Sequence, residues 1–236
     1  MGEPLQKTKG VVDLVFLIDV TGSMSPCLNA LKNNINLFVQ SLTTRDANNT
    51  TPVRHWRAKA VGYRDFEHDA EPIIDHPFVE TAEELREQLA SLVPEGGGDE
   101  PESLLEALYA VATMRATEKD APPDPYAWRY RSSAARVVII FTDASYKEPL
   151  AQPKGARLDD VINVLMTNRI ILSIFAPNMP CYERLAEADK AEWYPVEGGA
   201  NPQESLALFT SNQDNFKETL RQLARTVSKT ADVPLI

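Results

Sequence analysis

The chain has 236 residues, of which 43% are hydrophobic and 25% are charged, a composition typical of a soluble globular domain. Its formal net charge of −10 argues against a nucleic-acid-binding or anionic-membrane-binding protein. The N-terminal residues contain no apolar signal segment, and no apolar stretch approaches the length of a membrane helix. Cys27 and Cys181 provide no disulfide framework. We therefore expect a cytoplasmic protein with reduced thiols.

A nearly continuous apolar run at residues 11–19 predicts a strand that is buried on both faces, as in a parallel sheet. The strand is followed by a helix, because apolar residues recur there at spacings of four and three. These apolar positions are Met24, Leu28, Leu31, Ile35, Phe38 and Leu42. A second strand is expected at residues 53–66. A shorter one is expected at residues 72–79, where two prolines indicate the edge of a sheet.

Thr81 and Glu84 have the spacing of a capping box, which predicts a helix that ends near residue 93. A glycine-rich loop at residues 94–103 then leads into another helix. The apolar face of that helix consists of Leu104, Leu105, Leu108, Val111 and Ala112. Residues 118–134 are rich in proline and aromatic side chains, and they are expected to form a long connection.

The most apolar predicted strand is at residues 137–141, and Thr142-Asp143-Ala144 follows it directly. The rest of the chain predicts a helix, a buried strand, a short helix and a further strand. These lie at residues 158–168, 170–175, 182–189 and 193–196. After a short apolar stretch at residues 206–209, a long helix is expected. It carries Phe216, Leu220, Leu223 and Val227 on one face.

The alternation of strands and helices predicts an α/β fold whose mostly parallel sheet is covered by helices on both faces. No repeat or second domain is evident, so residues 1–236 are expected to form one domain. In such sheets, ligands bind beyond the carboxyl ends of the strands. Three loops bring oxygen-bearing side chains to that edge. The loop after the first strand carries Asp19, Thr21 and Ser23. The glycine-rich loop carries Asp99, and the loop after the fourth strand carries Asp143.

Carboxylate and hydroxyl oxygens are ligands for Mg²⁺, Ca²⁺ or Mn²⁺, and no soft ligand is present among these residues. By itself, the pattern Asp19-x-Thr21-x-Ser23 could equally cap the following helix. The glycines at residues 96–98 could instead cradle a phosphate. This second reading is disfavoured because the neighbouring acids repel anions and no Gly-Lys-Ser/Thr follows.

Three motifs resemble those of the von Willebrand factor A domain. They are Asp19-Val-Thr21-Gly-Ser23-Met, Gly-Gly-Gly-Asp99-Glu-Pro-Glu and Phe-Thr142-Asp143-Ala, and the first is similar to the form found in the intracellular branch of the family. The resemblance covers a core of roughly residues 10–230. It implies a Rossmann-like three-layer sandwich around a six-stranded, mostly parallel sheet with one antiparallel edge strand at residues 72–79.

The resemblance also implies a metal-ion-dependent adhesion site that holds a divalent cation, with Mg²⁺ favoured and Ca²⁺ or Mn²⁺ as alternatives. The implied ligands are Asp19, Thr21, Ser23, Asp99 and Asp143. Many adhesion members have threonine at the position of Asp99. With three carboxylates around one divalent ion, the site would be formally −1 and would attract an acidic partner group less strongly.

The function that this resemblance implies is a metal-dependent protein-interaction module, such as an adaptor or assembly factor, rather than an enzyme. Its partner would be a cytosolic protein, for which the resemblance suggests an AAA+ ATPase, a kinase or a phosphatase. Tyr146, Lys147 and Leu150 follow Asp143, so we expect them to rim the metal-binding face and to contact the partner.

The alternative function is a Mg²⁺-dependent phosphohydrolase that resembles the haloacid dehalogenase class, with Asp19 as the nucleophile. That class has a second acid two residues later, where this chain has Thr21, and a lysine after a later strand, for which Lys147 is only loosely placed. For Arg64 and Asp65, at the end of the second predicted strand, we expect structural ion pairs or loop hydrogen bonds.

Overall fold

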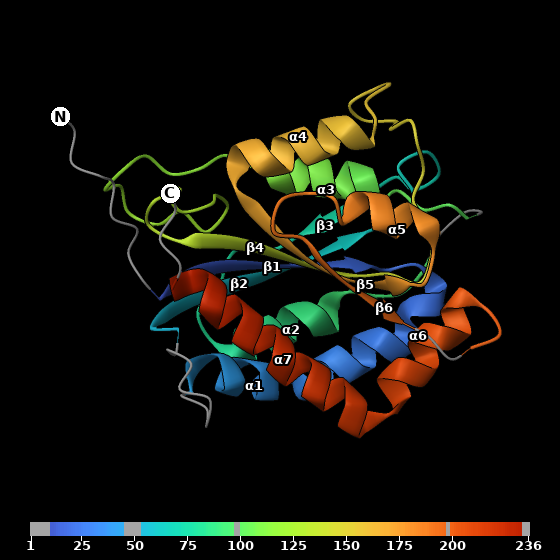
Figure 1. Ribbon diagram of the computed structural model, residues 1–236, viewed down its shortest axis with the longest axis horizontal. Helices are drawn as coiled ribbons and strands as arrows, with labels where there is room; N and C mark the ends of the chain where they lie inside the picture. The colour runs from blue at the N-terminus through green and yellow to red at the C-terminus, as the bar shows by residue number, and fades with distance from the viewer. Residues whose placement is uncertain (1–9, 45–52, 97–99, 197–198, 233–236) are drawn as a thin grey trace.

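The computed structural model describes residues 10–44, 53–96, 100–196 and 199–232. Its centre is a six-stranded sheet with the strand order β3-β2-β1-β4-β5-β6 (Figure 1). The strands are β1 (Val11–Asp19), β2 (His55–Tyr63), β3 (Ile73–Asp75), β4 (Ala135–Phe141), β5 (Ile170–Pro177) and β6 (Glu192–Val196). Only β3 pairs antiparallel with its neighbour, so the predicted mostly parallel sheet with one antiparallel edge strand is confirmed.

Helices cover both faces of this sheet and create the three layers visible in Figure 1. One face is covered by α1 (Ser25–Thr43), α2 (Ala82–Ser91), α6 (Pro202–Ser211) and α7 (Gln213–Asp232). The other face is covered by α3 (Leu104–Thr113), α4 (Leu158–Asn168) and α5 (Pro180–Leu185). A 3-10 turn, η1 (Gly22–Met24), precedes α1.

The two apolar layers explain why seven of the nine residues of β1 are apolar. Alternate side chains of a strand point to opposite faces, so Phe16 packs in the core on the α1 side while Leu17 packs in the core on the α3 side. Every residue of β1 is buried. The predicted apolar stripe of α1 is also confirmed, since its members from Leu28 to Leu42 are buried in the first of these cores.

Local capping signals set several boundaries. The hydroxyl of Thr81 accepts a hydrogen bond from Glu84 N at 3.2 Å, which confirms the predicted cap of α2. Asn201 caps α6 in the same way, because its Oδ1 accepts from Glu204 N at 2.8 Å. The apolar stretch expected at residues 206–209 is therefore part of a capped helix.

The predicted edge strand at residues 72–79 is shorter than expected. Only Ile73–Asp75 pairs with β2, and beyond it Val79 forms an isolated bridge with Ala58. Pro77 has no N–H to donate, and its carbonyl instead accepts a hydrogen bond from Gln88 of α2. The ladder therefore stops before this proline.

Residues 118–134 fold against the amino-terminal edge of the sheet as a long connection. Trp128 is fully buried, and its indole N–H donates to Val111 O at 3.0 Å, whereas Tyr126 is 52% exposed. Within the residues that the structure describes, no helix combines the length and the apolar character needed to cross a membrane.

The strand order reverses at the centre of the sheet. The chain moves from β1 outward to β2 and β3, and then returns to place β4 on the other side of β1. The loops after β1 and β4 consequently diverge at a shared carboxyl edge, which is the place where open α/β sheets bind ligands.

Candidate metal-binding site

Asp19 is the last residue of β1, and its side chain is fully buried. One carboxylate oxygen, Oδ1, accepts a hydrogen bond from Thr21 N at 2.9 Å. The other, Oδ2, accepts from Thr142 Oγ1 at 3.1 Å. Asp19 therefore joins the loop after β1 to the loop after β4 and fixes the backbone of its own loop.

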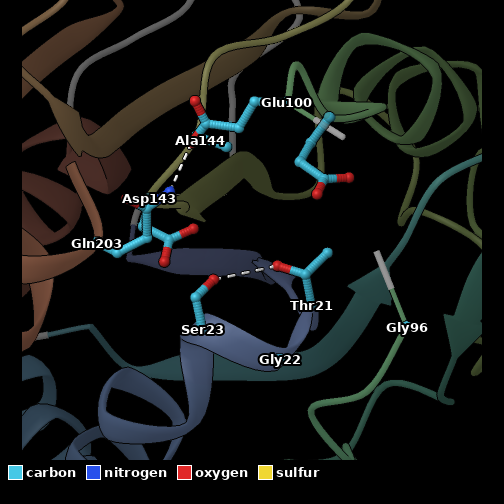
Figure 2. A pocket seen from close by; sticks show the side chains of 9 residues that line it. Thr21, Gly22, Ser23, Gly96, Glu100, Asp143, Ala144 and Gln203 are labelled. Carbon is cyan, nitrogen blue, oxygen red and sulfur yellow. Dashed lines mark hydrogen bonds between the residues drawn. The ribbon is translucent and has the colours of Figure 1, made fainter. Parts of the chain in front are cut away.

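The hydroxyls of Thr21 and Ser23 lie 3.5 Å apart, and Figure 2 shows them turned toward each other. Neither hydroxyl caps a helix. Thr21 is the N-cap of η1 without a side-chain cap hydrogen bond, and the N-cap of α1 is Met24. The capping interpretation of the pattern is therefore wrong, and both hydroxyl oxygens remain available to the space above the loop.

Asp143 follows β4 and is 1% exposed, yet its Oδ2 has no hydrogen-bond partner among the described residues. In Figure 2 its carboxylate faces the hydroxyl of Ser23. A buried carboxylate oxygen without a donor is energetically costly, and such atoms are rare in folded proteins. This oxygen is therefore the strongest indication that the site receives something from outside the chain.

Thr21, Ser23 and Asp143 line one pocket with a volume of about 270 Å³ (Figure 2). Its other walls come from the loop before α3 and from α6, where Gln203 Nε2 donates to Glu100 Oε1 at 2.6 Å. The lining residues are Thr21, Gly22, Ser23, Gly96, Glu100, Glu102, Asp143, Ala144 and Gln203.

The pocket gathers acidic groups in a poorly hydrated place. Burial raises the pKa of Asp19 to about 7; hydrogen bonding to Thr21 opposes this rise, and the charge of Asp143 adds to it. Burial also raises the pKa of Asp143, against a hydrogen bond with Ser23. For Glu102, burial and the nearby charges of Asp19 and Asp65 raise the pKa to about 8.

The donor chemistry fits a hard divalent cation. Two carboxylates and two hydroxyls supply oxygen ligands of the kind that Mg²⁺, Ca²⁺ and Mn²⁺ prefer, and a cation would offset the clustered charge. Across the described ranges, no three His, Cys, Asp or Glu side chains gather closely enough to hold a metal ion. A complete set of metal ligands therefore needs the hydroxyls of Thr21 and Ser23. Asp99, the fifth predicted ligand, lies outside the described residues.

The structure corrects the expectation that Tyr146, Lys147 and Leu150 form an accessible rim. Tyr146 is 8% exposed and its hydroxyl donates to Cys181 O at 2.6 Å, while Leu150 is 2% exposed. Both pack in the core on the α3 side of the sheet. The amine of Lys147 donates to Asp65 Oδ2 at 2.6 Å and to Glu67 Oε2 at 3.2 Å, so it is engaged within the chain.

Ion pairs brace the surrounding loops. Asp65 accepts from both Lys147 and His68, and Arg64 pairs with Glu95 at 3.1 Å, so both residues form the structural contacts expected of them. Two residues of the pocket were not predicted from the sequence: Gln203, which reaches the pocket from α6, and Glu102. The position of Glu102 in the same motif as Asp99 was the only available signal.

Comparison with known proteins supports this fold. Residues 13–121 match the family model of the von Willebrand factor A domain. The chain is 26% identical over 175 residues to alpha-protein kinase vwkA of Dictyostelium discoideum, in a match that covers 69% of this chain and 24% of that protein. The chain thus spans about a quarter of the length of this relative.

Two structures of proximal thread matrix protein 1 from the mussel byssus share the fold. They superpose with TM-scores of 0.53 and 0.51 at 10% and 11% identity. These matches cover 92% and 90% of this chain but only 47% and 46% of those chains, so this chain spans about half of their length. The family match, the three motifs and the sheet topology together show that the chain carries a von Willebrand factor A domain.

Proposed function

We propose that this chain is a metal-dependent protein-interaction module that holds a divalent cation with Asp19, Thr21, Ser23 and Asp143, and with Asp99 as the fifth ligand. One observation carries the proposal: Asp143 keeps a buried carboxylate oxygen without a hydrogen-bond donor beside two hydroxyls that cap no helix. All of the available donors are oxygens, so Mg²⁺ is the favoured ion, with Ca²⁺ or Mn²⁺ as alternatives.

Within this proposal the four described residues have different tasks. Thr21, Ser23 and Asp143 have oxygen atoms directed into the pocket, and they would hold the ion. Asp19 already accepts hydrogen bonds on both oxygens, so it contributes to holding the ion by fixing the Thr21 loop and by adding negative charge. When bound, the cation would offer a partner protein a positive charge at the surface of the domain.

The partner is proposed to be a cytosolic protein, with an AAA+ ATPase, a kinase or a phosphatase as candidate classes. The relative from Dictyostelium discoideum is named as an alpha-protein kinase, and the match covers only 24% of it. This name favours a role near a kinase, and we propose that the role is that of an adaptor or assembly factor in the cytoplasm. The protein-interaction role does not require this chain itself to be an enzyme.

The buried carboxylate of Asp19 disfavours the alternative phosphohydrolase. A nucleophilic oxygen must reach substrate, whereas Asp19 is fully buried and both of its oxygens are engaged. A phosphate-ester assay with Mg²⁺ separates the two functions. Turnover that disappears in Asp19→Asn would favour the enzyme.

Calorimetric titration of the chelator-treated protein with Mg²⁺, Mn²⁺ and Ca²⁺ tests the proposed site. We expect saturable binding by the wild type and a loss of at least tenfold in affinity for Asp143→Asn and Thr21→Val. Ser25→Ala is the matched control, because its hydroxyl lies next to the loop but donates to Gly22 O. If the wild type binds none of the three ions at millimolar concentration, the proposed function is wrong.

Partner capture then tests the interaction role. Proteins retained by the immobilised domain in Mg²⁺ should be lost both in chelator and with Asp143→Asn, and they should be retained by Ser25→Ala. Retention that is the same in all four conditions would show that the interaction does not use the metal.

A further inference from the structure

Glu102 is held rigidly at the wall of the pocket. Its N–H donates to Ser145 O at 2.8 Å, and its carbonyl accepts from Lys147 N at 2.8 Å. These two hydrogen bonds make a short parallel bridge between Glu102 and Tyr146. The backbone of Glu102 is therefore fastened to the loop that also carries Asp143.

The side chain of Glu102 has the same unusual property as that of Asp143. It is 5% exposed, it lines the same pocket, and its Oε2 has no hydrogen-bond partner among the described residues. Leaving such an oxygen without a donor is costly. Glu100, on the same wall, differs because it is exposed and its carboxylate accepts from Gln203.

Lys147 is the cationic side chain whose charge acts on Glu102, but its hydrogen bonds go to other acids. Its Nζ donates to Asp65 and Glu67. The pocket thus contains a buried carboxylate that is fixed in place and lacks a counter-ion contact in the described part of the chain. A cation between this residue and Asp143 would supply that contact.

We infer that Glu102 belongs to the cation site as an additional carboxylate that raises the affinity of the site for multivalent ions through its charge. This inference rests on the proposed function. Glu102 lines the same pocket as Asp143, Thr21 and Ser23, so its carboxylate acts on an ion that those three residues hold. It is a positioning residue that strengthens the hold of Asp143, Thr21 and Ser23 on the cation.

Calorimetric Mg²⁺ titrations of wild type, Glu102→Gln, Glu102→Asp and Glu83→Gln, at a pH above the Glu102 pKa of about 8, test this role. We expect Glu102→Gln to weaken Mg²⁺ binding about tenfold and Glu102→Asp, which keeps the charge, to restore most of the affinity. Glu83→Gln should change the affinity by less than about threefold, because its carboxylate is exposed on α2 and does not line the pocket. A thermal melt in chelator establishes that each variant is folded before titration.

Titration with a second ion shows whether Glu102→Gln weakens binding through the lost charge or through a change in structure. Tb³⁺ carries one more charge than Mg²⁺, so the loss caused by Glu102→Gln should be larger for Tb³⁺ than for Mg²⁺. The inference would be overturned if a folded Glu102→Gln bound Mg²⁺ as tightly as Glu83→Gln does, or if it lost affinity equally for both ions. The proposed function would stay in place. A wild type that binds none of the ions would overturn both.

Discussion

Arg57 donates to both carboxylate oxygens of Asp13, from Nε at 2.8 Å and from Nη2 at 2.7 Å. The two residues are direct partners across β1 and β2, and both are buried. Asp13 also accepts from Arg129 N at 2.7 Å and from Arg129 Nη1 at 2.8 Å. One buried acid thus fastens the connection at residues 118–134 to the sheet, at the edge opposite the candidate site.

Replacing Asp13 with alanine should destabilise the domain strongly. Arg57 would keep its hydrogen bonds to the carbonyls of Asp124 and Ala127, but its buried charge would lose its counter-ion. Breaking one side of a buried ion pair costs about 3–5 kcal/mol, and we expect a loss of this size in the free energy of unfolding measured with urea. Arg86→Ala is the control, because it breaks an exposed ion pair with Glu83. It should change the free energy of unfolding by less than about 0.5 kcal/mol. Similar losses in both variants would contradict the role assigned to Asp13.

Asp65 should make stability fall steeply in acid. Burial raises the pKa of its carboxyl, but hydrogen bonds from Lys147, Glu67 N and His68 outweigh burial and lower the pKa to about 2. Because this folded-state pKa lies below the ordinary value of 3.8, Asp65 contributes stability above pH 3.8 that is lost as the pH falls toward 2. Urea unfolding between pH 5 and pH 2 measures this slope.

Lys147→Met removes the principal donor and tests the origin of that slope. The variant should be less stable than wild type at pH 7, and its stability should depend less on pH between 3.8 and 2. Glu67→Gln is the matched control, since Glu67 also accepts from Lys147 but is largely exposed. An unchanged acid slope in Lys147→Met would show that the lysine does not hold the pKa of Asp65 down.

The sheet was predictable because its signals are local. The apolar runs of β1, β4 and β5 are long enough to identify buried parallel strands, and Thr81 with Glu84 identified the start of α2. The end of β3 was not predictable in the same way, because its length depends on the hydrogen bond between Gln88 and the carbonyl of Pro77, which joins separate elements.

The site was predictable only where it is built from short motifs. Asp19 ends β1, and Thr21, Ser23 and Asp143 lie shortly after the ends of strands, so the topology alone brings all four to one edge. The burial of Tyr146 and Leu150 depends instead on tertiary folding of their loop, in which Leu150 N donates to Ala156 O at 2.8 Å. Sequence position next to Asp143 therefore said nothing about their exposure.

Gly62 should not tolerate a side chain. A Cβ at this position of β2 would lie 2.9 Å from Leu92 Cδ2 and 3.1 Å from Val20 Cγ1, both in the tightly packed core. Gly62→Ala should therefore cost about 1–3 kcal/mol of unfolding free energy. Gly22→Ala is the control, because a Cβ there meets nothing within 4 Å, and its stability should stay close to that of wild type. A Gly62→Ala protein as stable as wild type would show that the core at this point is loosely packed.

Asp143→Asn should affect stability in opposite directions with and without metal. In chelator the variant should be more stable by about 1 kcal/mol, because it removes a buried charge with an unpartnered oxygen. With Mg²⁺ at a hundred times its dissociation constant, the wild type should gain about 2.7 kcal/mol and overtake the variant, which no longer holds the ion. Urea unfolding in chelator and in Mg²⁺ measures both differences, and Ser25→Ala should follow the wild type in each. If the order of stabilities were the same in both conditions, the unpartnered oxygen of Asp143 could not be a metal ligand.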